Sequence, residues 1–236
     1  MPHHIDPAAY RAWFSTALGR RVDADEKAVV LALAQLRAGE QVLDVGCGDG
    51  NYTGPAAELT GSAVGLDRSP DMLRAAALRL AHLPGIRWIE GDATRLPFAD
   101  ASFDVVLVVT VLCFVADRHA VIREAHRVLR PGGRLVVAEL GRYSPWALER
   151  RLRGLAGSRT WRHAHFFSRH ELESLLGDAG FTDLAHGAAV FYPPLRIPAR
   201  GAIEWLGRWL WPWAGALQIV RGRRGAARRF ERRFDP

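Results

Sequence analysis

Glycines occupy alternate positions just after a short apolar segment in the first quarter of the chain. Residues 42–45 are Val-Leu-Asp-Val, and glycines follow at positions 46, 48 and 50. Glycine lets a backbone approach a ligand closely, because it adopts φ values that a Cβ atom disfavours. A helix is expected over 52–59, and its free N–H groups would face the turn. The dinucleotide pattern needs a glycine where Asn51 stands, so the loop indicates a different nucleotide-like ligand.

Acidic residues accompany the first three predicted strands. Asp44 lies in the strand before the glycine turn, Asp67 ends the strand 63–67, and Asp92 follows the strand 86–90. The carboxyl ends of parallel strands meet at one edge of a sheet, where Asp67 could accept hydrogen bonds from both ribose hydroxyls and Asp92 from an adenine amine. Three carboxylates would repel a pyrophosphate and would suit a cationic nucleoside. S-adenosylmethionine has that character.

These acids need a parallel sheet to bring them together. Apolar segments alternate with helical patterns from residue 41 to residue 139, which predicts a doubly wound α/β fold in one domain. The expected strands cover 41–45, 63–67, 86–90, 103–109 and 134–139, and the expected helices cover 52–59, 69–81 and 118–129. Beyond residue 141 we expect a helical insert at 142–166, a helix over 168–180, a strand at 184–191, a Trp-rich helix and a last strand at 216–221.

Two helices are expected before the first strand. The first would end near Gly19, and the second would cover 24–36 with Asp23 or Asp25 as its N-cap. We accordingly divide the single domain into a helical lid, a cofactor-binding core, a helical insert with strand six that forms a substrate cap, and a Trp-rich and Arg-rich end. Their respective ranges are 1–38, 39–141, 142–200 and 201–236.

Three aromatic residues lie on one face of the first expected helix. Tyr10, Trp13 and Phe14 have the i, i+3, i+4 spacing that places side chains together. The stripe either packs on the core or forms a lid over the ligand.

The positive charge is concentrated at the C-terminal end. The net charge is +7, and the segment from Arg221 onward holds seven arginines and two acids, which is +5 and leaves +2 for the rest. Such a segment is either a solvated face or a contact for phosphate, a membrane surface or a partner. We expect no nucleic-acid partner for the nearly neutral body.

Several classes of protein do not fit the composition. The first thirty residues lack a signal-peptide pattern, and the longest apolar run, 105–116, is too short to cross a bilayer. Two cysteines, Cys47 and Cys113, indicate no disulfide framework, so we expect a cytoplasmic protein. We expect no metal site, and either a monomer or a homodimer.

Taken together, these motifs resemble the class I S-adenosylmethionine-dependent methyltransferases, most closely the small-molecule branch that includes the ubiquinone and menaquinone methyltransferases. The matching segments are 42–50, 64–73, 91–98 and 124–135. The resemblance implies a Rossmann-like sheet of seven strands whose last strand is antiparallel, and S-adenosylmethionine as the cofactor.

The resemblance also implies roles for individual residues. Asp44 and Gly46 would line the methionine end of the cofactor, Gly48 would form the turn beneath it, and Asp67 would hold the ribose. The other residues implied at the cofactor are Cys47 (with packing as its alternative role), Arg68 and Met72 beside the adenine, Asp92 and Ala93 at its edge, Thr110 near the sulfonium, and the lid residues Tyr10, Trp13 and Phe14.

The chemistry follows from the cofactor. A sulfonium methyl is a strong electrophile, so the protein mainly aligns donor and acceptor in line and excludes water. A phenol or hydroxyl acceptor would benefit from a general base, for which His165, His163 and Tyr10 are candidates without a supporting motif.

The acceptor is predicted from what the chain lacks and from its aromatic residues. No Asn/Asp-Pro-Pro-aromatic motif follows the strand 103–109, and no Pro-Cys nucleophile is present, which disfavours common DNA methyltransferase classes. The insert and a tryptophan cluster (205, 209, 211 and 213) would suit a small hydrophobic or aromatic acceptor, or peripheral contact with a membrane. The alternative is a packed amphipathic helix. An RNA methyltransferase that uses the basic tail and a non-catalytic cofactor-binding regulator are the alternatives.

Overall fold

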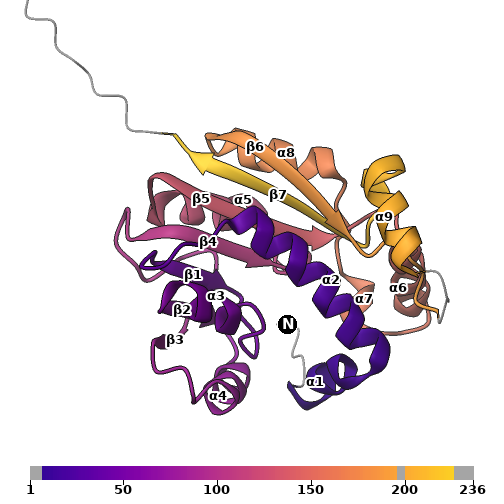
Figure 1. Cartoon of the computed structure of the whole chain (residues 1–236), viewed down its shortest axis with the longest axis horizontal. Coiled ribbons are helices and arrows are strands. Elements are labelled where there is room, and N and C mark those ends of the chain that lie inside the picture. The colour runs from indigo at the N-terminus through magenta and orange to yellow at the C-terminus, as the bar shows by residue number, and fades with distance from the viewer. Residues whose placement is uncertain (1–6, 196–199, 226–236) are drawn as a thin grey trace, which may run out of the picture.

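A seven-stranded sheet forms the centre of the molecule in a computed structural model that describes residues 7–195 and 200–225. The strand order is β3-β2-β1-β4-β5-β7-β6, and β7 is antiparallel to both of its neighbours (Figure 1). The strands are β1 (Val42–Val45), β2 (Ala63–Asp67), β3 (Ile86–Glu90), β4 (Phe103–Val109), β5 (Leu129–Leu140), β6 (Phe181–Ala189) and β7 (Leu217–Arg224). The predicted mostly parallel sheet is confirmed.

Helices cover both faces of this sheet (Figure 1). They are α1 (Pro7–Ser15), α2 (Ala17–Ala34), α3 (Thr53–Thr60), α4 (Pro70–Arg79), α5 (Arg118–Val128), α6 (Pro145–Leu155), α7 (Arg159–Arg162), α8 (Arg169–Asp178), α9 (Arg200–Leu210) and the 3₁₀ turn η1 (Pro212–Ala214). Two predicted starts are confirmed, because Ser69 caps α4 and Ser168 forms a capping box with Glu171 at α8.

Alternate side chains of the central strands enter two separate cores. Leu43 and Val106 pack with α5 and α8 on one face, whereas Val42 and Val105 pack with α2 and α3 on the other. Both faces of β1 and β4 are therefore buried, which explains why these strands are apolar throughout instead of alternating.

The predicted boundary between the first two helices is wrong. Thr16 caps α2, with its hydroxyl accepting from the Gly19 N–H at 2.9 Å, so Gly19 lies inside α2. A Cβ on Gly19 would lie 2.1 Å from the Trp13 carbonyl oxygen, so this glycine permits close approach of the two helices and does not end one. Asp23 and Asp25 lie within α2, where Asp23 accepts from an Asn51 side-chain N–H at 2.7 Å.

Two strands begin earlier than predicted because each contains a bulge. The Pro131-Gly132-Gly133 segment does not separate α5 from β5; it bulges out between the pairs Phe103–Leu129 and Val105–Arg134. In β6, Asp183 has a φ of +50°, and the register shifts between residues 182 and 185. Bulges break the two-residue periodicity on which strand prediction depends.

The last strand is longer than the predicted 216–221 and takes up part of the basic segment. Arg221 is buried and donates to Asp183 at 3.3 Å, while Arg224 donates to two carbonyl oxygens where α5 passes into β5. These arginines serve the fold. The arginines beyond position 225 lie outside the described residues.

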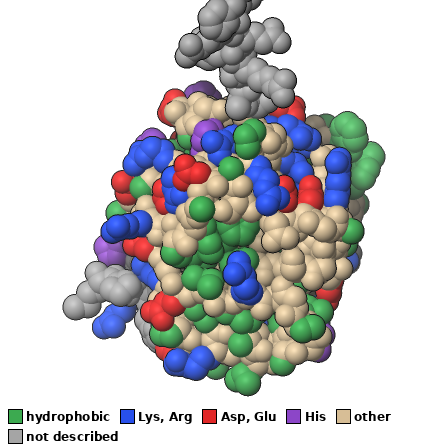
Figure 2. All heavy atoms as spheres, turned by 90° about the vertical axis from the view of Figure 1, so that its left-hand side faces the viewer, with side chains coloured by type: hydrophobic (Ala, Val, Ile, Leu, Met, Phe, Trp, Pro, Cys, Tyr) green, Lys and Arg blue, Asp and Glu red, His purple; other side chains and the backbone are tan. Residues whose placement is uncertain are grey.

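Charge of the two signs is mixed on the side of the molecule where β4 and β5 begin. Figure 2 shows basic and acidic side chains interspersed on this face, in keeping with ion pairs such as Arg130–Asp104 at 2.6 Å and Arg134–Glu40 at 2.7 Å. Among the described residues, this face carries no broad field of one sign that would attract a polyanion.

Candidate cofactor-binding site

The glycine loop turns at the carboxyl end of β1. Gly46 has a φ of +69°, and the N–H groups of Gly46 and Cys47 both donate to the Leu66 carbonyl, at 2.7 and 3.0 Å. A Cβ on Gly46 would lie 2.4 Å from a Val111 methyl group. The loop after β4 therefore packs directly on this glycine, and a larger residue would push the two loops apart.

Gly48 faces open space. Its φ is +54°, and no atom lies within 4 Å of the position that a Cβ would take. Its N–H donates to Asp67 Oδ2 at 2.9 Å, and the Ser69 N–H donates to Asp67 Oδ1 at the same distance. Each carboxylate oxygen retains a second lone pair, so Asp67 joins the glycine loop to the end of β2 and can still accept from a sugar hydroxyl.

Asp44 is buried beneath this loop. Its Oδ2 accepts from the Thr53 hydroxyl at 2.6 Å, which ties β1 to the start of α3. Burial raises the pKa of Asp44 to about 7. The nearby charge of Asp67 also raises this pKa, and the hydrogen bond from Thr53 lowers it. A nearby cation would favour the ionised form of Asp44.

Asp92 lies exposed after β3. Its Oδ1 accepts from the backbone N–H and from the hydroxyl of Thr94, both at 2.8 Å, and these bonds lower the pKa of Asp92. The carboxylate is therefore ionised and oriented. Of the other residues predicted at the adenine, Ala93 is half-buried, Met72 is buried in α4 and Arg68 is exposed.

The segment after β4 is held by a buried carboxylate that the motifs did not identify. Glu139 is fully buried in β5 and accepts from the N–H groups of Val111, Leu112 and Cys113 at 2.9, 2.6 and 3.2 Å. Burial raises its pKa to about 7 against the effect of these bonds. Thr110, with a φ of +53°, begins this segment. The available signal was an isolated glutamate in the apolar run 135–140.

The structure therefore brings Gly46, Gly48, Asp67 and the Thr110 segment together at the carboxyl ends of the strands. We call this part of the molecule the cofactor edge. Residues 43–137 match the family model described as Methyltransferase domain. These residues are a methyltransferase domain.

Two relatives show how far the similarity extends along the chain. An uncharacterized Mycobacterium bovis protein is 37% identical over 189 residues, which are 80% of this chain and 63% of that protein. A demethylmenaquinone methyltransferase of Tropheryma whipplei is 41% identical over 119 residues, covering 50% of this chain and 48% of that protein. The chain thus spans less than two thirds of either relative.

A crystal structure of an S-adenosylmethionine-dependent methyltransferase from Thermotoga maritima superposes with a TM-score of 0.72 and 27% identity, covering 92% of this chain and 95% of that one. The predicted family, fold and cofactor, S-adenosylmethionine, are confirmed.

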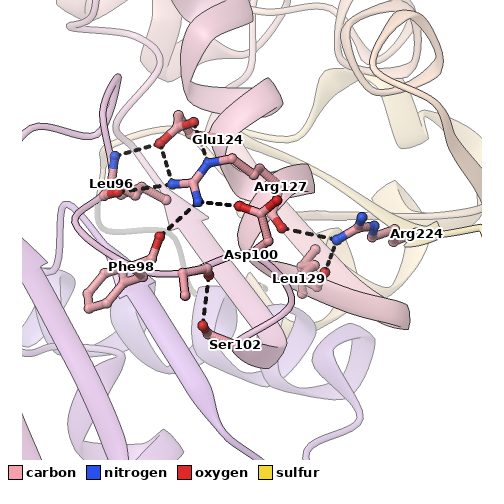
Figure 3. A network of polar contacts seen from close by, with 9 residues as sticks. Leu96, Phe98, Asp100, Ser102, Glu124, Arg127, Leu129 and Arg224 are labelled. Carbon is pink, nitrogen blue, oxygen red and sulfur yellow. Dashed lines mark hydrogen bonds and ion pairs between the residues drawn. The ribbon is translucent and has the colours of Figure 1, made fainter.

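Within the methyltransferase domain, a polar network fixes the loop that follows Asp92 (Figure 3). Arg127 of α5 donates to Glu124 and Asp100 at 2.8 Å and to the carbonyl oxygens of Phe98 and Leu96 at 2.8 and 3.0 Å. Glu124 in turn accepts from the Leu96 N–H at 2.7 Å. Two of the segments that carry the family resemblance therefore bind each other.

Helix α1 contacts the glycine loop of the methyltransferase domain. Arg11 forms an ion pair with Asp49, whose side chain is buried. Trp13 packs edge-on against Phe14 and against Trp146 of α6, with ring centroids 4.8 and 6.3 Å apart. The Tyr10 side chain lies outside the described part of the structure. Helix α1 thus bridges the glycine loop and the insert.

The two cysteines are buried beside carboxylates. Burial raises the pKa of the Cys47 and Cys113 thiols well above their usual value, and the nearby Asp44 and Glu139 add to the effect. Both are protonated at neutral pH, which fits packing and disfavours nucleophilic roles.

His165 lies at an open cavity of about 420 Å³ between α5 and α8. Its Nε2 is 3.1 Å from Glu171, which also accepts from Arg142 at 2.7 Å. Burial lowers the pKa of His165 although Glu171 opposes the shift. A neutral imidazole can accept a proton. His163 is exposed outside this group.

Helix α2 adds a carboxyl group that the motifs also missed. The Glu26 side chain keeps partial contact with solvent, yet burial raises its pKa to about 7 while Arg150 of α6 acts in the opposite direction. Arg150 in turn lies over the rings of Trp146 and Trp161, at 5.4 and 4.9 Å. A pKa near neutrality is the one that suits a general base.

Proposed function

We propose that this protein transfers a methyl group from S-adenosylmethionine to a small hydrophobic or aromatic acceptor by in-line displacement. The observation that carries the proposal is the position of Asp67, which joins the glycine loop to β2 and keeps lone pairs for a ribose beside the open space at Gly48. The resemblance of half the chain to a demethylmenaquinone methyltransferase supports a quinol-like acceptor.

Each residue of the edge has a part in this proposal. The cofactor, when bound, supplies the electrophilic methyl group. Asp67 would orient the ribose, Asp92 would accept from the adenine amine, and Asp44 would favour the cationic methionine end. The Thr110 segment, held by Glu139, would shape the wall beside the reacting centre, where positioning contributes most of the rate.

A proton must leave a phenolic acceptor, and four groups are candidates to take it. His165 is neutral and oriented by Glu171, and Glu26 has a pKa near 7. His163 and Tyr10 remain predictions from the sequence. Replacing each of the four separately and measuring turnover at several pH values would identify the base.

Calorimetric titration tests the cofactor, with S-adenosylmethionine, S-adenosylhomocysteine and NAD as ligands. We expect micromolar binding of the first two and none of NAD, followed by turnover with quinols or phenols. Tight binding without turnover across the acceptor panel would support a non-catalytic regulator instead.

The place and partners of the reaction follow from the same features. We propose a cytoplasmic reaction, which free and buried Cys47 and Cys113 support. We also propose that the Trp- and Arg-rich C-terminal part touches a membrane surface. Within residues 7–195 and 200–225, no helix has the length and hydrophobicity of a transmembrane span.

The RNA alternative rests on the basic segment, of which Arg221 and Arg224 serve the fold. If RNA binding is unchanged in a chain that ends at Gly225, the arginines beyond that position do not bind RNA.

A further inference from the structure

Helix α9 has its polarity inverted. The face toward the protein carries Glu204 and Gly207, both buried. The face toward solvent carries Trp205 and Trp209, which are 64% and 75% exposed, together with Leu210. A surface helix of a globular protein normally does the opposite.

This orientation is held by specific contacts. The Glu204 carboxylate accepts from the N–H groups of Val190 and Phe191 at 3.0 and 2.9 Å, just beyond the end of β6. A Cβ on Gly207 would lie 2.3 Å from the Phe191 ring. Rotation of α9 to bury its tryptophans would break both hydrogen bonds and insert side chains where only glycine fits, so the apolar face is a fixed feature.

Helix α6 extends the same surface. Leu148, Leu152 and Leu155 lie at i, i+4 and i+7 and are all exposed, Leu155 at 86%. On its other side, α6 is anchored by Trp146, whose Nε1–H donates to the Tyr192 carbonyl at 2.8 Å.

The two helices belong to one end of the molecule (Figure 1). The Tyr143 ring before α6 packs on the Trp213 ring after α9, with centroids 6.1 Å apart. We call this surface the α6–α9 face; it comprises Leu148, Leu152, Leu155, Trp205, Trp209, Leu210, Trp211 and Trp213, all exposed.

The charge around this face identifies its partner. Residues 142–162 and 200–214 hold eight arginines and two glutamates. Arg142, Arg153 and Arg208 pair with glutamates, and Arg150 lies over the rings of Trp146 and Trp161. Arg151, Arg159 and Arg162 are exposed. Two copies joined through this face would place like charges together. An anionic bilayer would attract the arginines and accept the indoles at its headgroup level.

We propose that the α6–α9 face lies in the interface of an anionic membrane and presents the cofactor edge to lipid-dissolved acceptor. The inference deepens the proposed function and rests on it for the acceptor. A chain of contacts links the face to the site: Trp146 of α6 touches Trp13 of α1, and Arg11 of α1 pairs with Asp49 of the glycine loop. Membrane contact would therefore occur beside the lid.

Vesicle flotation tests the proposal with the full chain and with vesicles of phosphatidylcholine alone or mixed with phosphatidylglycerol. We expect binding to the mixed vesicles, and a fall of about tenfold or more for Trp205→Ala/Trp209→Ala, since exposed indoles dominate interfacial binding. Leu152→Gln should weaken binding less. Leu78→Ala, an equally exposed apolar side chain on α4, is the matched control and should have no effect.

Four outcomes would overturn the proposal: no vesicle binding, equal binding by the double tryptophan variant, equal binding to neutral vesicles, or loss of binding only in a chain that ends at Gly225. A dimer in light scattering that the double variant converts to a monomer would make a second copy the occupant. Calorimetry with S-adenosylmethionine is measured in parallel. If the double variant still binds the cofactor, it is folded. If the unmodified chain does not bind the cofactor, the proposed function fails and the membrane proposal is judged by the vesicles alone.

Discussion

Two buried glutamates have the same task in two regions of the molecule. At the cofactor edge, Glu139 accepts from three backbone N–H groups and holds the segment after Thr110. In the C-terminal part of the chain, Glu204 accepts from two and holds α9. The surfaces that they support differ. The first presents glycine backbone and carboxylates suited to a polar cation, and the second presents tryptophan and leucine suited to lipid. The same buried device can therefore position opposite chemistries.

Glu139→Ala should give the largest effect. Three buried N–H groups would lose their acceptor, so we expect a loss of about 3 kcal/mol or more in the free energy of unfolding, measured by urea denaturation. Cofactor affinity should fall too. Glu139→Gln keeps one acceptor oxygen and should lose less; equal losses in the two variants would show that the bonds do not matter.

Asp67→Ala addresses the cofactor edge directly. We expect S-adenosylmethionine binding to weaken by about 2–3 kcal/mol, because charge-assisted hydrogen bonds to the sugar are lost. Asp67→Asn retains one oxygen that can accept from a loop N–H group. Comparing the two variants therefore separates the effect of Asp67 on the glycine loop from its effect on ribose binding. Unchanged affinity in calorimetry would remove the ribose assignment.

Glu204→Ala tests whether the two regions are independent. It should cost about 1–3 kcal/mol of stability, since two buried N–H groups lose their acceptor. We expect cofactor affinity to stay constant while vesicle binding falls, because α9 loses the two hydrogen bonds that hold its apolar face outward. A parallel loss of cofactor affinity would mean that α9 and the cofactor edge form a single unit.

Removal of the residues before Thr16 tests the lid. The truncated chain keeps the N-cap of α2 but loses the Arg11–Asp49 pair and the Trp13 contact. We expect turnover to fall more than the melting temperature. A collapse in melting temperature would make α1 part of the core.

Glu26→Gln should have the smallest effect, seen in the pH dependence. Because the pKa of Glu26 is raised to about 7 in the folded state from 4.5, the folded state binds more protons between those values, and stability falls as pH rises through this window. Asp44 and Glu139 contribute with the same sign. The variant should flatten the slope between pH 5 and 7; an unchanged slope would exclude Glu26 as a contributor.

Local patterns predicted the strands and the glycine loop of the cofactor edge well. The predicted bounds of the strands 63–67, 86–90 and 103–109 agree with the structure. The strands 63–67 and 103–109 are buried almost throughout, and their apolar composition shows it, whereas 86–90 is a partly exposed edge strand. The glycine loop was equally predictable, since each of its turns needs a backbone that only glycine adopts easily. Prediction was poorest where bulges shift the strand register in β5 and β6, and at Gly19, whose role depends on a neighbouring helix.

The sequence by itself determined the sheet, the glycine loop and the family, because these follow from periodicity and motifs within a few residues of one another. Only the tertiary structure decided what Glu139, Glu204 and Arg11 do. Each of them meets its partner across 13 to 38 positions of sequence, and a residue's burial and partners at such separations depend on how the elements pack. The inverted face of α9 is the clearest case, because its composition alone fits a buried helix equally well.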